Sequence, residues 1–344
     1  MLGWLYNHAE YGVNVMKKFI NDIDTLLDES LQGFAKAHAD IIQLHTQPNI
    51  VTRSTAAPAS KVVLISGGGS GHEPLHTGFV GIGMLDAACP GQIFTSPTPD
   101  QMMAAAELTE NGEGVLFIVK NYAGDVMNFE IASEMIDCPF ETVLIDDDVS
   151  LPKNHSTGRR GVAGTLIVEK ITGAAAENGM NLSDCKILGD KVNQMTASMG
   201  VALNCCTVPA LGKPTFELAD DEIEMGVGIH GERGHETIKL SSASEIVEQI
   251  ANAINEDLKP QKGQKALLHI NGLGSTPLME LHLIYNIAAQ FWEKRGIDIC
   301  RSLVGNYTTS LDMTGCSITL TLLDEEMIKF WDAPVNTANL RWNC

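Results

Sequence analysis

The sequence of 344 residues contains no apolar run long enough to cross a membrane. Its longest uninterrupted apolar stretches, such as residues 115–119, hold only a handful of residues, whereas a membrane-spanning helix needs about 20. Residues 1–15 have neither a basic start nor a sustained apolar stretch, so they do not match a secretory signal. Because Met16, followed by two lysines, is a more natural beginning, we interpret residues 1–15 as a leader or an added remnant.

Basic residues are also scarce. Lys and Arg number 23 against 43 Asp and Glu, which gives a formal net charge of −20, and no basic run is longer than two residues. Such a surface repels phosphate backbones and anionic lipids, so we expect no direct binding to nucleic acid or to a membrane. The hydrophobic content of 44% is typical of a globular chain, and a chain of this length is expected to form two domains.

The eight cysteines form no C-x-x-C pair, and only Cys205 and Cys206 are adjacent. This scatter favours reduced cysteines that pack in the core over a disulfide framework or a zinc site. The sequence therefore predicts a cytoplasmic protein.

Strands, polar loops and helices alternate in the first part of the chain. An amphipathic helix is predicted over residues 21–38, and short apolar strands over 61–65, 115–119 and 142–145 each end in a glycine-rich or polar loop. Helices are expected at 127–136, 161–178, 182–199, 244–258 and 277–295, with later strands at 203–207, 224–230, 266–270 and 317–322. The pattern predicts two α/β domains, 16–200 and 201–344, each a central sheet flanked by helices, with functional loops at strand ends.

The sharpest local feature is the segment SGGGSGHEP at residues 66–74. Glycines directly after a buried strand permit positive φ and let backbone N–H groups approach a ligand oxygen, so we interpret them as a ligand-binding turn. The segment is not a Walker A loop, because the required spacing and lysine are absent. His72 and His76 formally match the zinc motif H-E-x-x-H, but Pro74 and the adjoining glycines argue against the continuous helix that this motif needs.

Residues 226–231 match the loose pattern G-x-G-x-x-G, but no ribose-binding acid follows. We expect these glycines to clear space around His230, whose neutral imidazole is a nucleophile toward carbonyl groups. A hydrogen-bonded turn histidine is the alternative interpretation.

Two polar groups follow the strand at 115–119. The cation of Lys120 could bind a hydroxyl or phosphate oxygen, and the carboxylate of Asp125 could accept a proton. The alternative is a surface turn with a capping Asp. The three aspartates at 146–148 are expected to form hydrogen bonds and caps, because consecutive side chains on a strand rarely converge on one metal ion.

Seven segments occur in one order along the chain: SGGGSGHEP (66–74), CPGQIFTSPTP (89–99), KNYAGD (120–125), IDDDV (145–149), GRRGV (158–162), GVGIHGE (226–232) and SLDMTGCSITL (310–320). Together they resemble the family of dihydroxyacetone-binding subunits of dihydroxyacetone kinase, from residue 16 to about residue 334. The resemblance implies a homodimer of two-domain subunits in which His230 holds dihydroxyacetone as a hemiaminal. It implies that His72 and Asp125 act as acid and base on the substrate, and that the site is completed by Gly69, Ser70, Gly71 and Lys120.

No cofactor or metal site is expected in this chain. The resemblance implies that a separate nucleotide-binding subunit carries ADP or ATP with magnesium, and that a phosphocarrier subunit of the phosphotransferase system rephosphorylates it. Some relatives are instead transcriptional co-activators that bind dihydroxyacetone, and this function stays open. The presence of all four polar site residues favours the kinase subunit, since a sensor needs only binding that differs between two states. A dinucleotide-dependent oxidoreductase would rest on residues 226–231 alone.

Overall fold

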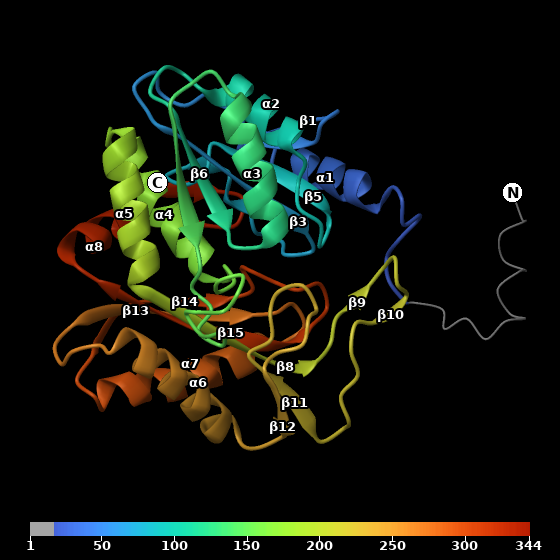
Figure 1. The fold of residues 1–344 in the computed structure, drawn as a ribbon, viewed down its shortest axis with the longest axis vertical. Coiled ribbons are helices and arrows are strands. Elements are labelled where there is room, and N and C mark those ends of the chain that lie inside the picture. Colours follow the sequence, from blue (N-terminus) through green and yellow to red (C-terminus); the bar gives the residue numbers. More distant parts are fainter. Residues whose placement is uncertain (1–16) are drawn as a thin grey trace, which may run out of the picture.

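This computed structural model describes residues 17–344, so the interpretation of residues 1–15 lies outside the described residues. Two six-stranded sheets form the centre of the molecule, and helices lie between them and on their outer sides (Figure 1). The chain completes most of the upper sheet in Figure 1 before it enters the lower one. This arrangement confirms the predicted α/β fold with two sheets flanked by helices.

The first sheet has the strand order β1-β2-β5-β3-β6-β7. Strands β5, β3, β6 and β7 run parallel, whereas β1 and β2 are antiparallel at one edge. The carboxyl ends of the parallel strands therefore meet at one edge of the sheet. The strand bounds are β1 (Ile42–His45), β2 (Ile50–Arg53), β3 (Val63–Ser70), β5 (Ala87–Ile93), β6 (Val115–Lys120) and β7 (Phe140–Ile145).

Alternate residues of β3 pack against helices on opposite faces of this sheet. Val63 belongs to a buried cluster with Met102 of α2 (Pro99–Thr109) and Phe129 of α3 (Ala123–Met135). Leu64 belongs to another with Leu166 of α4 (Gly164–Glu177) and with residues of α5 (Leu182–Gln194). The short run of apolar residues is thus a strand buried on both sides. The amphipathic helix predicted at residues 21–38 is α1 (Leu26–Ala37), which contacts β1.

The second sheet has the order β12-β11-β8-β15-β13-β14, and only β13 and β14 are parallel neighbours. Helices α6 (Ala243–Leu258) and α7 (Leu278–Glu293) cover one of its faces and share a buried cluster with Leu268 and Ile318. Leu267 joins the cluster of α4 and α5, so the other face turns toward the first unit. The strands are β8 (Thr196–Asn204), β11 (Glu222–Met225), β12 (Glu236–Lys239), β13 (Lys265–Gly272), β14 (Asp298–Gly305) and β15 (Thr314–Leu323).

After the second sheet the chain returns to the first unit. Phe330 and Trp331 of α8 (Glu325–Asp332) belong to the buried cluster of α4. Strand β16 (Val335–Thr337) pairs with β4 (Gly81–Ile82) and with β17 (Arg341–Trp342). A short hairpin, β9 (Thr207–Val208) and β10 (Lys213–Pro214), and the 3-10 helix at Thr77–Phe79 complete the described elements. The unit that contains the first sheet therefore includes residues from both ends of the described chain, a feature that the division at residue 200 did not include.

Three predicted elements differ from the structure. The strand expected at 224–230 ends at Met225, and the residues after it form the loop that contains His230. The helix expected at residues 182–199 ends at Gln194, because the following residues form β8 and pair antiparallel with β15. The strand expected at 203–207 is consequently not a single strand, because residues 203–204 end β8 and Thr207 begins β9. Tertiary pairing decides this segment, which is apolar enough for either structure.

The free cysteines agree with the sequence analysis, since all eight are unpaired. Within residues 17–344 we also find no helix whose length and apolar character would let it span a bilayer.

Lys170 offers a test of how the returning segment is held. Its buried ammonium donates a hydrogen bond to the carbonyl oxygen of Phe330 at 2.7 Å. Burial lowers the pKa of Lys170 from 10.5 to about 7, although Asp332 opposes this. Below pH 7 the buried charge of Lys170 therefore lowers the free energy of unfolding by its full amount. This destabilisation decreases as the pH rises toward 10.5.

We expect Lys170→Met to flatten the dependence of the free energy of unfolding on pH above about pH 7, by up to about 1.4 kcal/mol per pH unit. Urea unfolding followed by tryptophan fluorescence measures this slope. Lys329→Met, which removes an exposed lysine of α8, is the matched control. Equal slopes in the two variants would contradict the lowered pKa.

Candidate active site

The glycine run is part of strand β3 and not the turn that the sequence suggested. Residues 67–69 are extended, and a positive φ first occurs at Gly71 (+104°). Glycine is needed because neighbouring groups come too close for a side chain. A Cβ on Gly68 would overlap the ammonium of Lys120, and one on Gly69 would lie within 2.8 Å of the backbone that follows β5.

The segment after β3 contacts the second unit directly. The N–H of Leu311 donates to the carbonyl oxygen of Gly71 at 2.8 Å, and the N–H of Thr309 donates to that of His72 at 3.2 Å. His230 also belongs to the second unit, in the loop after β11. The candidate site is therefore formed where the two units meet.

Four aromatic rings gather at this junction. The ring centroids of His72 and His230 are 4.6 Å apart in an edge-to-face arrangement. Phe94, which follows β5, stacks on His72 at 5.1 Å and lies edge-on to His230 at 5.5 Å. Tyr122, which follows β6, lies edge-on to His230 at 4.3 Å. Phe94 and Tyr122 thus position the imidazoles and exclude water from much of the imidazole surface.

His72 is neutral, and one hydrogen bond fixes its tautomer. Its Nδ1 lies 2.7 Å from the carbonyl oxygen of Thr309, which can only accept, so Nδ1 carries the hydrogen. Nε2 then holds a lone pair, and it is buried without a partner within the described chain. Burial holds the pKa of His72 well below its usual value, and the proximity of His230 and Lys120 acts in the same direction. The ring thus begins as a base and can donate a proton only after it has taken one up.

His230 is a half-buried neutral imidazole. Burial lowers its pKa to about 3, with further lowering by Lys120 and Arg160. Among residues 17–344 no group hydrogen-bonds to its ring nitrogens, whereas its backbone N–H donates to Glu232. Arg160 binds Glu232 at 3.0 Å and the carbonyl oxygen of Gly226 at 2.7 Å, which holds the loop in place. A ring of this kind is available as a nucleophile.

Lys120 and Asp125 form a buried pair beside the two histidines. The Lys120 ammonium is fully buried, 3.8 Å from Asp125 Oδ2 and 3.3 Å from the carbonyl oxygen of Gly67. Burial lowers the pKa of Lys120, an effect that Asp125 opposes. Burial raises the pKa of Asp125, against the effect of Lys120. Asp125 is only 2% exposed, so the alternative of a surface turn is wrong.

One oxygen of Asp125 is free for a ligand. Asp125 lies in the first turn of α3 without capping it, and its Oδ1 is buried with no partner in residues 17–344. An unpaired carboxylate oxygen at such a position can accept a proton or a hydrogen bond from a bound hydroxyl.

The structure brings His72, Lys120, Asp125 and His230 together, as the sequence analysis expected. Ser70 and Gly71 adjoin them, but both already have protein partners. The Ser70 hydroxyl donates to the carbonyl oxygen of Gly91 at 2.7 Å, and the Gly71 N–H donates to Glu73 at 3.0 Å. The substrate-binding roles of Gly69, Ser70 and Gly71 remain predictions.

The two metal interpretations considered from the sequence rest on residues 72–76 and 146–148. Within residues 17–344 no cluster of three or more acidic, His or Cys side chains could hold an ion. His72 and His76 do not share a helix and bind different partners. Asp147 accepts from the backbone N–H groups of Val162 and Gly164 at 2.8 Å, which confirms its predicted hydrogen-bonding role. Asp148 likewise pairs with Arg160.

Sequence reasoning missed several residues of the site. Phe94, Tyr122 and Arg160 lie within the quoted motif segments, which was the available signal. Glu169 lies in an apolar helix outside every motif, and His76 was considered only as a zinc ligand.

The comparisons with known proteins agree on one family. The Dak1 domain family model matches residues 32–339, and the chain belongs to this family. It is 47% identical to the dihydroxyacetone-binding subunit of the PEP-dependent dihydroxyacetone kinase of Escherichia coli, over 95% of this chain and 99% of the relative. It is 45% identical to the corresponding subunit of a phosphotransferase-system-dependent kinase of Listeria innocua, over 94% and 99% of the two chains.

Solved structures support the same fold. The dihydroxyacetone kinase of C. freundii matches with a TM-score of 0.84 and 33% identity, over 95% of this chain and 60% of the kinase. A dihydroxyacetone kinase operon co-activator also matches with a TM-score of 0.84 and 33% identity, over 90% of this chain and 97% of the co-activator.

The neutrality of His230 can be measured directly. With a pKa of about 3, its ring stays uncharged and its NMR signals stay constant between about pH 5 and pH 8. In urea the same ring should titrate near its ordinary value of 6.5. Two-dimensional spectra of protein labelled with 15N at histidine test this, and His230→Gln identifies the signal. A native midpoint above about 5 would show that burial does not suppress the charge.

Proposed function

We propose that this chain is the dihydroxyacetone-binding subunit of a dihydroxyacetone kinase that depends on the phosphotransferase system. One observation carries the proposal: a neutral nucleophilic imidazole, His230, lies beside His72 and the buried Lys120–Asp125 pair. It does so in a chain 47% identical to the Escherichia coli subunit over nearly its whole length. The product is dihydroxyacetone phosphate.

Binding is covalent in this proposal. A ring nitrogen of His230 forms a bond to the central carbon of dihydroxyacetone, and the carbonyl π electrons move to the oxygen. That oxygen takes up a proton while the His230 ring loses one, so the hemiaminal equals protein plus substrate. His72 suits this transfer because its Nε2 lone pair can accept the proton and then return it to the oxygen.

Phosphoryl transfer follows from the bound state. A terminal hydroxyl oxygen attacks the γ-phosphorus of ATP, the bond to ADP breaks, and the hydroxyl proton moves to Asp125. The unpaired Oδ1 of Asp125 can take this proton, and Lys120 stabilises negative charge on the substrate oxygens. Fixing the ketone on His230 removes most of its freedom to turn, which lowers the barrier by positioning.

The nucleotide belongs to a partner in this proposal. The sequence has no Walker A loop, and this chain aligns with 99% of the length of the Escherichia coli dihydroxyacetone-binding subunit. We assign ADP or ATP with magnesium to a separate nucleotide-binding subunit, which a phosphocarrier subunit recharges. In this proposal the chain acts as a homodimer in glycerol metabolism. Its eight free cysteines favour a location in the cytoplasm.

A transcriptional co-activator is the second candidate, because the operon co-activator matches this fold with the same TM-score as the kinase. Sequence identity is 33% to the co-activator and up to 47% to curated kinase subunits, which favours the kinase.

Adduct formation tests the covalent step. Dihydroxyacetone labelled with 13C at its carbonyl carbon should show a second signal, typical of a tetrahedral carbon, when the protein is present. His230→Ala should abolish this signal, whereas His282→Ala, which removes an exposed histidine of α7, should retain it. An equal signal in the His230→Ala variant would overturn the assignment.

Asp125→Asn tests the transfer step and separates the two candidate functions. We expect turnover with ATP and an active nucleotide-binding subunit to fall about 10²–10⁴-fold, because the general base is lost, while the 13C adduct persists. Production of dihydroxyacetone phosphate can be followed with a coupled dehydrogenase. Wild-type protein that forms the adduct but never turns over would favour the co-activator, and unchanged turnover in the variant would exclude Asp125 as the base.

A further inference from the structure

A buried histidine and a buried glutamate form a chain of polar contacts with Lys120, and the proposed reaction steps do not use them. His76 Nε2 lies 2.7 Å from the ammonium of Lys120, and His76 Nδ1 lies 2.6 Å from Glu169 Oε1. The exposed fraction is 5% for His76 and 0% for Glu169. A continuous polar chain thus runs from the end of β6 through one imidazole to α4.

The partners of His76 decide where its hydrogen lies. The hydroxyl of Ser66 donates to the carbonyl oxygen of Ile118 at 2.7 Å, so the Ser66 oxygen faces His76 Nδ1, 3.1 Å away, with its lone pairs. Glu169 Oε1 also accepts at Nδ1 when it is ionised. When Glu169 is ionised, two acceptors thus face Nδ1, and this nitrogen then carries the hydrogen. In the neutral ring Nε2 therefore carries a lone pair and accepts a hydrogen bond from Lys120.

This hydrogen bond controls both the charge and the direction of Lys120. A protonated lysine has three N–H donors. One points to His76 Nε2 and one to the carbonyl oxygen of Gly67, which leaves the third for Asp125 and a substrate oxygen. If the hydrogen of His76 moved to Nε2, the ring would offer a donor to Lys120, and only a neutral amine could accept it.

We propose that His76 and Glu169 are positioning residues that keep Lys120 protonated and directed at the substrate. The inference rests on the proposed function, because it assigns Lys120 to a substrate oxygen. It gives a role to the second histidine of the H-E-x-x-H match, which the sequence offered only as a zinc ligand.

The charged and titratable groups around Lys120 come from every element packed against it. They are Asp125 on α3, Glu169 on α4, His72 and His76 in the segment after β3, and His230 from the second unit. The pKa values of the three histidines are all lowered, chiefly by burial, so the two carboxylates are the groups that can oppose the burial of the Lys120 charge.

Glu169 acts in the range where Lys120 needs support. Burial raises the pKa of Glu169 to about 8, against the opposing charge of Lys120. Burial also lowers the pKa of Lys120 below 10.5. Glu169 therefore gains its negative charge as the pH rises toward the range in which Lys120 loses its proton, and the new carboxylate favours both a hydrogen on His76 Nδ1 and a positive charge on Lys120.

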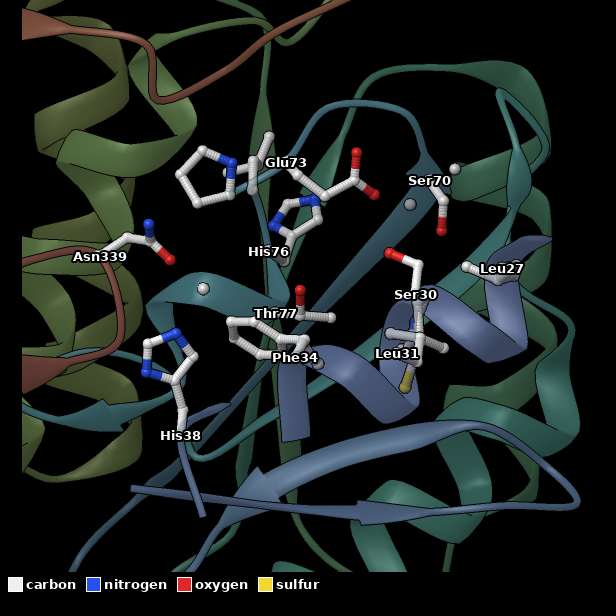
Figure 2. Close-up of a pocket in the computed structure, with 18 residues that line it drawn as sticks. Leu27, Ser30, Leu31, Phe34, His38, Ser70, Glu73, His76, Thr77 and Asn339 are labelled. Atoms are coloured by element: carbon white, nitrogen blue, oxygen red, sulfur yellow. The ribbon is translucent and has the colours of Figure 1, made fainter. Parts of the chain in front are cut away.

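A cavity makes His76 accessible to a chemical test. Its volume is about 400 Å3, and it lies between α1 and the glycines of β3, with Phe34 and Thr77 in its lining (Figure 2). His76 is one of the lining residues, so removing its side chain opens the space behind Lys120 to this cavity. A small molecule such as imidazole can then take the place of the missing ring.

The first experiment measures dihydroxyacetone affinity against pH for the full chain, with the 13C adduct as the readout. Glu169→Gln keeps the shape and an acceptor oxygen but removes the charge. We expect nearly wild-type affinity at about pH 6.5, where Glu169 is protonated. On the alkaline limb we expect about tenfold weaker binding, because this limb moves down by about one pH unit. A defect of the same size at every pH, or an unchanged profile, would overturn the proposal.

The second experiment is chemical rescue. His76→Ala should weaken binding at all pH values, and added imidazole should restore much of it. His269→Ala is the matched control, because His269 is equally buried but hydrogen-bonds to Leu303 in the second sheet. Failure of imidazole to improve binding by the folded His76→Ala protein, or the same improvement in the control, would refute the role of His76. Circular dichroism establishes folding.

The outcomes distinguish failure of the proposed function from failure of the positioning role. If wild-type protein gives no adduct at any pH, the proposed function fails. If the wild type forms the adduct but Glu169→Gln leaves its pH profile unchanged, the proposed function stands and only the positioning role fails.

Discussion

The burial of a single positive charge, the ammonium of Lys120, constrains the arrangement of the whole site. Removing an ammonium group from water costs several kcal/mol, so each of its donors needs an acceptor. The structure supplies the carbonyl oxygen of Gly67 and the Nε2 of His76 as acceptors, and it places the Asp125 carboxylate 3.8 Å away as the opposite charge. Glycine at position 68 is part of the same arrangement, because a side chain there would displace the ammonium. The absence of a side chain at position 68 is thus a consequence of where this charge is held.

Burial, together with the same charge, explains why two histidines stay neutral in a strongly acidic protein. A net charge of −20 would by itself favour protonated imidazoles, yet burial and the proximity of Lys120 lower the pKa values of His72 and His230. Local desolvation outweighs the distant surface charge, which water and salt screen. A neutral His230 can add to a carbonyl, and a neutral His72 can move the proton that this addition releases.

The sequence was informative where chemistry lies at strand ends and uninformative where it depends on packing. Lys120, Asp125 and His230 could be named because each follows a recognisable strand or glycine segment, whereas the role of His72 came from the family resemblance. The sequence predicts a turn at the glycine run, whereas the structure has a strand there. Composition shows that these residues have no side chains, but it does not show which neighbouring atoms come close to them. Glu169 could not be found, since its neighbours in α4 are apolar and its partner His76 is 93 residues away in the chain. The return of α8 to the first unit was hidden for the same reason.

Because the site lies between two units of the chain, its selectivity for a substrate depends on how these units pack against each other. His230 arrives from the second sheet and the proton-handling groups from the first, so the complete set exists only when Thr309 and Leu311 dock on the segment after β3. In the proposed mechanism, covalent capture selects by reactivity, because a ketone can form a bond to His230 whereas glycerol has no carbonyl group to attack. A purely hydrogen-bonding pocket would have to distinguish the two molecules by whether the oxygen on the central carbon is a carbonyl or a hydroxyl. Holding a neutral nucleophile beside a buried cation therefore achieves a discrimination that shape alone would supply only weakly.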